Sequence, residues 1–437
     1  MYPAPILLSK RKARPASLLL LILLLPFTST LAAAPTETSP MPDPRIQEAI
    51  ALMNGFAERT GLTSGQTPRR YLWTDAFAVC NYLGLARTTG EEGYTGLALQ
   101  LVDQVHHTLG RHRDDDHRRG WISGLDEADG ERHPTRGGLR IGKALPERGP
   151  DAPMDERLEW DRDGQYFHYL TKWMHALDQV TRTTQQPRYN TWARELAQSA
   201  FDAFTNRSTL DRGPRRMDWK MSIDLTRVLV PSMGQHDPLD GYITALQLRT
   251  TATAQARPPA GPDLADTTGD YAAMIRRGEW ATPDPLGLGG LLIDAWRVQQ
   301  LIQQGTQPDA PLLDRLLEGV VIGLQHYARG DELRLPARYR LAFRELGLAI
   351  GLHALERLQR AVGPGTPASP RLRAQLQELM QYLPLRDAIE TFWRDPANQR
   401  TDTWAEHRDI NEVMLATSLA PDGFLMLLPP NNENPGD

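Results

Sequence analysis

Residues 159–177 read EWDRDGQYFHYLTKWMHAL, an aromatic stretch that also carries several titratable groups. Its apolar residues recur at helical spacing, which predicts a helix over residues 163–182. The polar side chains follow the same period and fall on one stripe of this helix: Asp161, Gln165, His168, Lys172 and His175. Such a stripe either faces solvent, as on an ordinary amphipathic helix, or lines a binding site.

The helical period continues along the chain, whereas alternating, strand-like runs are hard to find after residue 42. The predicted helices cover residues 44–61, 75–88, 92–109, 163–182, 188–206, 222–231, 238–250, 285–304, 309–328, 337–360, 370–392 and 406–419. Helices of this kind pair naturally into antiparallel hairpins, here about six. We therefore expect an all-α fold with a single domain over residues 43–428, an (α/α)6 toroid of inner and outer helices.

Glycine and proline add detail to this fold. Gly287, Gly289, Gly290, Gly347 and Gly351 recur within the later predicted helices. Gly inside a helix costs up to about 1 kcal/mol relative to Ala, so its repeated use predicts close helix–helix approach. Asp237 and Asp284 each precede a Pro-Leu pair, and we expect both to be N-caps.

The N-terminus resembles a secretory signal peptide. Four basic residues precede the apolar run SLLLLILLL at 17–25, and small residues follow it. The run is too short to span a bilayer comfortably, so we expect cleavage near residues 32–34 and no stable membrane anchor afterwards. The expected location is periplasmic or secreted. The tail at 429–437 is expected to be disordered.

Composition excludes several classes of protein. The formal net charge is −5, which argues against a nucleic-acid partner. The sequence has neither a phosphate-binding G-x-x-x-x-G-K motif nor a dinucleotide G-x-G-x-x-G after a strand, and we expect no cofactor. It also lacks a G-x-S-x-G motif for serine chemistry. The single cysteine, Cys80, is expected to be buried and inert.

Two long connections interrupt the helices, at 110–162 and 251–283. The first contains Trp121, Leu139 and Ile141 among its charges, so we expect it to be ordered over a cleft. Its run RHRDDDHRR at 111–119 holds Asp114, Asp115, Asp116 and His117, which could bind a metal ion. The flanking arginines favour a self-paired, solvated loop instead, and we expect no metal site. The second connection begins as a flexible Pro/Ala linker.

At the level of organisation the chain resembles the six-hairpin glycosidase superfamily. The resemblance is carried by the paired helices, by WTDAFAV at 73–79, by the long loop before GQYFHYLTKWMHAL, and by HRDINEVMLATSL at 407–419. It implies an enzyme acting on a carbohydrate substrate, in the first place a glycoside hydrolase. A polysaccharide lyase, a sugar isomerase with His168 paired to His407, and a non-catalytic glycan-binding toroid remain alternatives.

Glycoside hydrolysis needs two carboxyl groups across the scissile bond. The candidates for catalysis are Asp75, Asp163, Glu345 and Asp409, assisted by His168, Lys172 and His407. Lys172 is included because arginine is the usual cation of this chain, and lysine occurs after residue 42 only at 143, 172 and 220. Asp75 follows Thr74, a predicted N-cap, and could equally stabilise its helix.

Side chains that could bind the substrate fall into two groups. Aromatic platforms are expected at Trp73, Trp121, Tyr166 and Trp173, and arginines that could clamp an acidic sugar at Arg136, Arg140 and Arg344.

Overall fold

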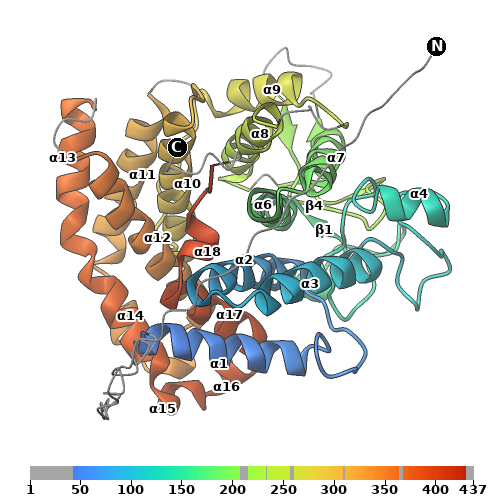
Figure 1. Ribbon diagram of the computed structural model, residues 1–437, viewed down its shortest axis with the longest axis horizontal. Helices are drawn as coiled ribbons and strands as arrows, with labels where there is room; N and C mark the ends of the chain where they lie inside the picture. The colour runs from blue at the N-terminus through green and yellow to red at the C-terminus, as the bar shows by residue number, and fades with distance from the viewer. Residues whose placement is uncertain are drawn as a thin grey trace, which may run out of the picture. The chain divides into compact units, whose positions relative to one another are not determined.

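The computed structural model describes residues 43–206, 215–232, 234–255, 260–308, 311–363 and 368–429. Six helices form a closed inner ring (Figure 1): α2 (Leu72–Thr89), α6 (Phe167–Thr184), α8 (Asp237–Thr253), α10 (Pro285–Gln303), α12 (Ala342–Ala361) and α17 (Arg408–Leu419). Each of these helices packs against the next, and α17 packs on α2 to close the ring. The described residues belong to one compact unit.

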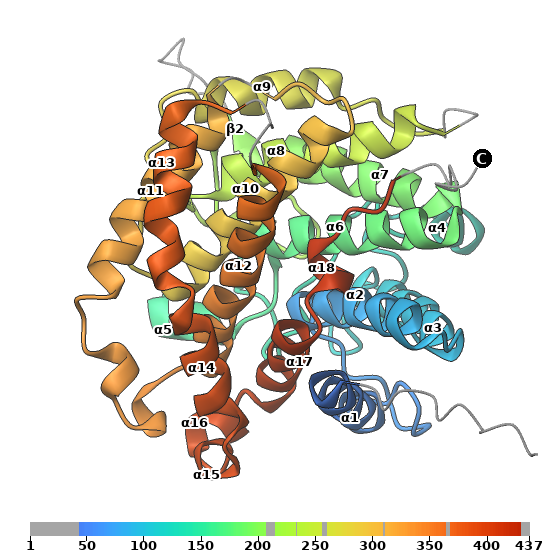
Figure 2. The same cartoon turned by 60° about the vertical axis from the view of Figure 1, so that its left-hand side comes forward.

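A second layer of helices surrounds this ring. Its members, in the order of their inner partners, are α3 (Gly93–Leu109), α7 (Pro187–Phe204), α9 (Ala265–Ile275), α11 (Leu312–Tyr327), α13 (Pro370–Leu379) with α14 (Pro384–Arg394), and α1 (Pro44–Arg59). Figure 2 shows α11 and α13 outside α10 and α12. The last hairpin joins the two ends of the domain, because α1 covers α17. The predicted all-α (α/α)6 toroid is confirmed.

Every predicted helical range holds a helix except residues 222–231, where the prediction was wrong. That stretch belongs to a small antiparallel sheet of β1 (Gln165–Tyr166), β4 (Lys220–Met221) and β5 (Val228–Val230). Two further strands, β2 (Thr205–Asn206) and β3 (Arg216–Met217), pair with each other. The place of the missing outer helix is taken by α9, which the sequence pattern did not reveal.

The remaining described elements are short. They are α4 (Glu127–Arg132), α5 (Glu156–Asp161), α15 (Pro396–Gln399), α16 (Asp402–Ala405), α18 (Asp422–Leu425), and the 3-10 turns η1 (Glu332–Arg334), η2 (Ala337–Tyr339) and η3 (Met380–Tyr382). No helix in the described part of the chain is long and apolar enough to cross a bilayer.

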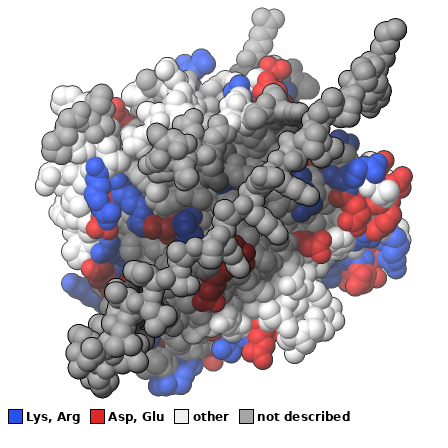
Figure 3. Space-filling model, viewed as in Figure 1, with Lys and Arg blue, Asp and Glu red and all other residues white. Residues whose placement is uncertain are grey.

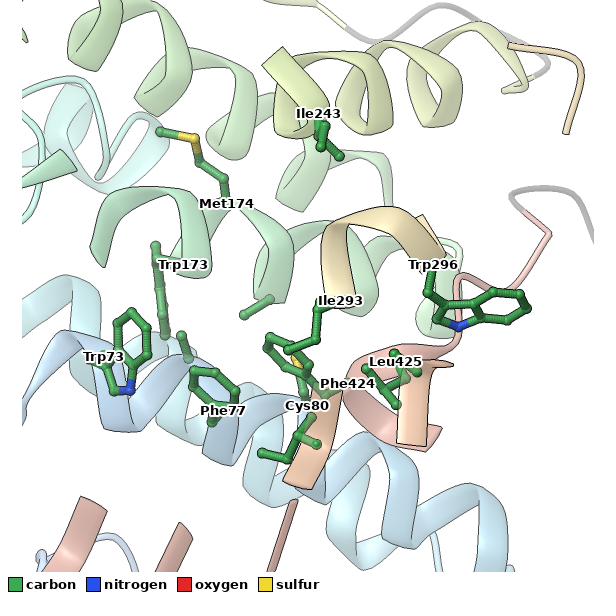
Figure 4. Close-up of a cluster of buried hydrophobic side chains, with 14 of the residues drawn as sticks. Trp73, Phe77, Cys80, Trp173, Met174, Ile243, Ile293, Trp296, Phe424 and Leu425 are labelled. Carbon is green, nitrogen blue, oxygen red and sulfur yellow. The ribbon is translucent and has the colours of Figure 1, made fainter. Parts of the chain in front are cut away.

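The C-terminal segment closes one end of the ring. Helix α18 packs on α2 and α10 and lies in the middle of the ring in Figure 1. Near the C-terminal end of α6, Gln179 Nε2 donates to the carbonyl oxygen of Gly423 at 3.0 Å. The ring of Phe424 stacks on Phe77 with centroids 4.2 Å apart, within the buried cluster that also holds Cys80 (Figure 4). Cys80 is therefore buried, as predicted.

The glycine-rich inner helices α10 and α12 approach each other closely, as predicted. A Cβ on Gly289 would lie 2.1 Å from the carbonyl oxygen of Gly347, and a Cβ on Gly351 would lie 2.6 Å from the Cα of Gly289. These glycines are therefore required for packing, because no larger side chain fits between the two backbones.

Helix α6 begins later than predicted, and the polar stripe is shorter as a result. Asp161 is the last residue of α5 and Gln165 lies in β1, so neither shares a helix with His168 and Lys172. The backbone at Gly164 has φ +146°, a conformation that only glycine adopts readily and that interrupts a helix. The stripe on α6 is thus reduced to His168, Lys172 and the buried His175.

Candidate functional site

One end of the inner ring is formed by the first turns of its helices. Trp73 of α2 contacts His168 of α6, with ring centroids 6.1 Å apart. His168 faces Asp237, the first residue of α8, with 3.9 Å between Nδ1 and Oδ1. The inner helices therefore present their N-terminal ends together, opposite the end that α18 closes.

The same end continues around the ring to α10, α12 and α17. Arg344 of α12 pairs with Asp284, the residue before α10, with 2.8 Å between Nη2 and Oδ1. The ring of Phe343 packs edge-on against His407, which precedes α17, with centroids 5.7 Å apart. The positive ends of several helix dipoles thus converge here and favour negatively charged groups.

In the part of the chain that the structure describes, the carboxyl group of Asp237 forms no ion pair with a lysine or an arginine, and its nearest basic neighbour is the His168 imidazole. The residue is 4% exposed, and its Oδ2 has no hydrogen-bond partner within the described ranges. Burial and the nearby charge of Asp240 raise the pKa of Asp237 to about 7, although Lys172 and a hydrogen bond from the backbone of Gly234 to the carboxyl group lower it. At neutral pH a large share of this carboxyl is therefore protonated and can donate a proton.

His168 has the opposite shift. Burial and the charge of Lys172 lower the pKa of its imidazole to about 4, against the smaller influence of Asp240. The ring is therefore neutral at neutral pH, so one nitrogen can accept a hydrogen bond or a proton. A neutral base thus lies beside a carboxylic acid.

Asp240 lies one turn into α8 and is ionised. Its Oδ2 accepts hydrogen bonds from Lys172 Nζ and Thr171 Oγ1, both at 2.6 Å. Burial by itself would raise the pKa of Asp240, but Lys172 and Arg297 outweigh burial and hold it below its ordinary value. Lys172 is thereby fixed at the site, with Nζ 6.0 Å from the ring centroid of Trp73.

Aromatic rings run outward from His168. The indole of Trp219 lies nearly parallel to His168, at 11° and 6.0 Å between centroids. Tyr166 packs against both rings, at 5.4 Å and 5.0 Å. Trp160 stands edge-on against Trp219 at 4.9 Å and is 55% exposed. We refer to His168, Tyr166, Trp219 and Trp160 as the aromatic series.

The four carboxyl groups predicted to be catalytic all lie in ion pairs with arginine. The pairs are Asp75 with Arg70 at 3.3 Å, Asp163 with Arg140 at 2.9 Å, Glu345 with Arg340 at 2.6 Å, and Asp409 with Arg59 at 3.0 Å. Burial raises the pKa of Asp75 to about 6, although Arg70 lowers it. Each of the four groups therefore has a structural role as an ion-pair partner, whereas Oδ2 of Asp237 has no hydrogen-bond partner within the described ranges.

The arrangement around Asp75 and Asp163 explains such structural roles. Asp75 accepts a hydrogen bond from the backbone nitrogen of Tyr71, the N-cap of α2, at 2.8 Å. The predicted N-cap, Thr74, lies inside the helix. Asp163 is fully buried and also accepts from the backbone nitrogen atoms of Gly142 and Gly164, at 3.0 and 3.1 Å. Both carboxylates therefore fix the backbone beside the site.

The predicted substrate-binding residues divide into two groups. Trp73, Tyr166 and Arg344 lie at the N-terminal end of the ring, as does His407. The others contact the outer layer or the long connection. Trp173 donates to His106 of α3 at 3.2 Å, Arg136 pairs with Glu195 of α7 at 3.1 Å, Arg140 holds Asp163, and Trp121 packs on His107 of α3 at 5.6 Å.

The charged loop at 111–119 was predicted to pair with itself, but it does so only in part, because Arg111, Arg113 and Arg118 also pair with acidic residues outside the loop. Arg113 binds Asp115 at 2.7 Å, and Arg118 binds Asp116 at 2.7 Å. Basic and acidic side chains lie interspersed on the side of the molecule that carries α4 (Figure 3). Within the residues that the structure describes, no group of three or more His, Cys, Asp or Glu side chains could hold a metal ion.

The carboxylates of α8, Asp237 and Asp240, were not among the residues predicted to be catalytic. Asp237 was expected to be an N-cap, but His236 occupies that position and Asp237 is the first helical residue. Asp284 is an N-cap as predicted and accepts from the backbone nitrogen of Gly287 at 2.9 Å. The repeated Asp-Pro-Leu motif was the available signal, because it marks the starts of two adjacent inner helices.

Comparisons with known proteins give structural likeness alone. No family model matches this sequence, and no curated protein matches it. A solved structure of an inactive variant of an α-1,6-mannanase from Salegentibacter sp. HEL1_6, in complex with α-1,6-mannotriose, is 13% identical; the match covers 86% of this chain and 99% of that chain, with TM-score 0.47.

Two epimerases also resemble the fold. A sugar epimerase from a ruminal bacterium is 10% identical over 78% of this chain and 86% of that chain, with TM-score 0.43. The cellobiose 2-epimerase of Spirochaeta thermophila DSM 6192 is 12% identical over 85% and 97%, with TM-score 0.42. At these identities and TM-scores the likeness assigns no activity.

Proposed function

We propose that the protein is a carbohydrate-active enzyme, a glycoside hydrolase whose site surrounds Asp237. The observation that carries this proposal is a pair of unsatisfied groups on two residues that neighbour His168. Trp73 Nε1 and Asp237 Oδ2 are both buried without a hydrogen-bond partner in the described part of the chain. Buried polar groups are nearly always hydrogen-bonded, so these two suit a ligand that both accepts and donates.

A sugar meets this requirement. Each hydroxyl group can accept a hydrogen bond from an indole N–H and donate one to a carboxyl oxygen. The C–H face of a sugar ring is apolar and packs against aromatic side chains such as Trp73 and Trp219, which lie beside the two polar groups. The site therefore combines directional polar contacts with aromatic surface.

The protonation states suit acid catalysis of glycosidic cleavage. Asp237 can give its proton to the leaving oxygen as the bond from that oxygen to the anomeric carbon breaks. A second, ionised carboxylate must then activate water or attack the anomeric carbon. The candidates are Asp240, which lies one turn further along α8 and which Lys172 and Arg297 keep ionised, and Asp284, which precedes α10 and pairs with Arg344. On this proposal kcat/KM falls as the pH rises through about 7, the pKa of Asp237, and falls at low pH where the second carboxylate becomes protonated.

A sugar epimerase or isomerase is the second candidate. The neutral imidazole of His168 and the carboxyl of Asp237, 3.9 Å apart, could remove a proton from carbon and hydrogen-bond to the adjacent carbonyl oxygen. A lyase is less well supported, since Arg136 and Arg140 are engaged by Glu195 and Asp163.

A glycan panel with purified protein in D2O distinguishes these reactions. A hydrolase releases new reducing ends, an epimerase incorporates deuterium at carbon without changing chain length, and a lyase produces the absorbance of an unsaturated uronate. Binding without any of these products would indicate a glycan-binding protein. If the protein neither converts nor binds any glycan of the panel, the proposal is wrong.

We also propose that the protein is exported, on the strength of the basic and apolar pattern at its N-terminus. Residues 1–42 lie outside the described part of the chain. N-terminal sequencing of protein recovered from the periplasm or medium should begin near residue 35. Full-length protein confined to the cytoplasm would exclude export.

A further inference from the structure

Trp160 is a large aromatic side chain that the fold leaves on the surface. It is 55% exposed, whereas its neighbour in the aromatic series, Trp219, is partly buried. Single exposed aromatic residues are common, but this one is continuous with the candidate site, because Trp219 contacts both Trp160 and His168. We infer that Trp160 and Trp219 form an outer sugar-binding subsite, and that the substrate is a neutral oligosaccharide extending outward from Asp237. This inference rests on the proposed function.

The backbone around Trp160 is held firmly. Lys143 Nζ donates to the carbonyl oxygen of Trp160 itself. Lys220 Nζ donates to the carbonyl oxygens of Glu159 and Arg162, at 2.6 and 2.9 Å. Lys220 also pairs with the Glu159 carboxylate at 3.0 Å. An exposed ring on so constrained a segment loses little conformational entropy on binding, which is the property of a preorganised platform.

These contacts also account for the rare lysines. The chain has lysine at only three positions after residue 42, and all three lie at this end of the ring. Lys143 and Lys220 hold the segment that carries Trp160, while Lys172 holds Asp240. A compact ammonium group can donate to several carbonyl oxygens at one point, which the planar guanidinium of arginine cannot do.

The rings are arranged in steps that lead from the buried acid to the surface. Successive centroids along the series lie 6.0 Å apart from His168 to Trp219 and 4.9 Å apart from Trp219 to Trp160. Trp219 is fixed in turn by the sheet, because its backbone nitrogen donates to Val230 at 3.1 Å. A chain of sugar rings with one unit at Asp237 would therefore meet Trp219 and then Trp160.

The charges nearby favour a neutral glycan. Lys143 and Lys220 are occupied by carbonyl oxygens, and Arg148 pairs with Glu159 at 3.1 Å. A sugar carboxylate would have to displace one of these contacts to pair with Lys143, Lys220 or Arg148. Neutral sugars need no counter-ion, since hydroxyl groups and C–H faces suffice for binding.

The test compares Trp160→Ala and Trp160→Phe with the wild type on a neutral oligosaccharide series from disaccharide to hexasaccharide. Loss of the ring should raise KM roughly tenfold or more for the longer members and leave kcat unchanged, because the outer subsite contributes ground-state and transition-state binding equally. Disaccharide turnover should not change, and Trp160→Phe should retain most of the affinity. Ile322→Ala, at a 53% exposed position on α11, is the matched control and should behave as wild type.

The same variants can be tested without turnover. Isothermal titration with each oligosaccharide should show that wild-type affinity rises with chain length and that this rise disappears in Trp160→Ala. If the protein binds glycans in this way but converts none, the catalytic proposal fails and the subsite stands. Equal affinities of Trp160→Ala and wild type for every neutral oligosaccharide, or an increase in affinity confined to acidic oligosaccharides, would overturn the inference.

Discussion

His168 of α6 and Asp237 of α8 occupy the first turns of adjacent inner helices, and their side chains approach to 3.9 Å between Nδ1 and Oδ1. Their acidities are reversed relative to ordinary values, because burial lowers the pKa of the imidazole to about 4 and raises that of the carboxyl to about 7. Near pH 6 the ordinary pair would be an ion pair, whereas this one is a neutral base beside a neutral acid. The inversion provides both a proton donor and a proton acceptor at the same point of the ring.

Asp237→Asn should make the free energy of unfolding less dependent on pH. The pKa of Asp237 rises from 3.8 in the unfolded chain to about 7 in the folded one. Between these values the folded state retains a proton that the unfolded state has lost, so wild-type stability falls as pH rises. An amide does not titrate. The free energy of unfolding of the variant, relative to that of the wild type, should therefore increase by up to a few kcal/mol from about pH 4 to about pH 7. Urea denaturation at both pH values measures this difference. A difference that is constant with pH would contradict the raised pKa.

Lys172→Met should reduce both stability and turnover. The variant leaves the Asp240 carboxylate buried with Thr171 and the more distant Arg297, at 3.5 Å, as its partners. Breaking a buried pair in this way costs roughly 3 kcal/mol. The double variant Lys172→Met with Asp240→Asn removes the uncompensated charge. It should regain part of the lost stability but remain inactive. A single variant with wild-type melting temperature would show that the pair contributes nothing to folding.

The substitutions Gly289→Ala and Gly290→Ala should change the free energy of unfolding in opposite directions, although the two residues are neighbours on α10. The first Cβ would lie 2.1 Å from the carbonyl oxygen of Gly347, whereas the second meets no atom within 4 Å. We expect Gly289→Ala to lose roughly 2 kcal/mol or more and Gly290→Ala to gain up to about 1 kcal/mol from helix propensity. Thermal unfolding of the two variants is the measurement. Equal effects would contradict the close packing of α10 on α12.

The fold could be predicted because it depends on local patterns. Helical periodicity marks most of the helices, and the glycines of α10 and α12 indicate where two of them touch. The error at 222–231 lies in a hairpin, because Val228–Val230 pairs with Lys220 and Met221, which pair in turn with Tyr166 and Gln165 in β1. A strand whose partner lies more than fifty residues away has no signature in its own few residues.

The site was harder to predict because the neutralisation of a carboxylate depends on distant arginines. Asp409 pairs with Arg59, which lies near the other end of the described sequence. Asp163 pairs with Arg113 and Arg140 of the long connection. The sequence therefore gives no means of separating these acids from Asp237, which has no such partner in the described ranges. Lys172 and His168 could be identified because both lie on one face of a strongly periodic helix.

The most direct test of the account is turnover by Asp237→Asn on whichever glycan the wild type converts, at the wild-type pH optimum. The amide keeps the shape of the side chain but cannot donate the carboxyl proton, so kcat should fall by about two to four orders of magnitude while the melting temperature does not decrease. A folded Asp237→Asn protein with wild-type kcat would contradict the proposal, because it would show that Asp237 is not the catalytic acid.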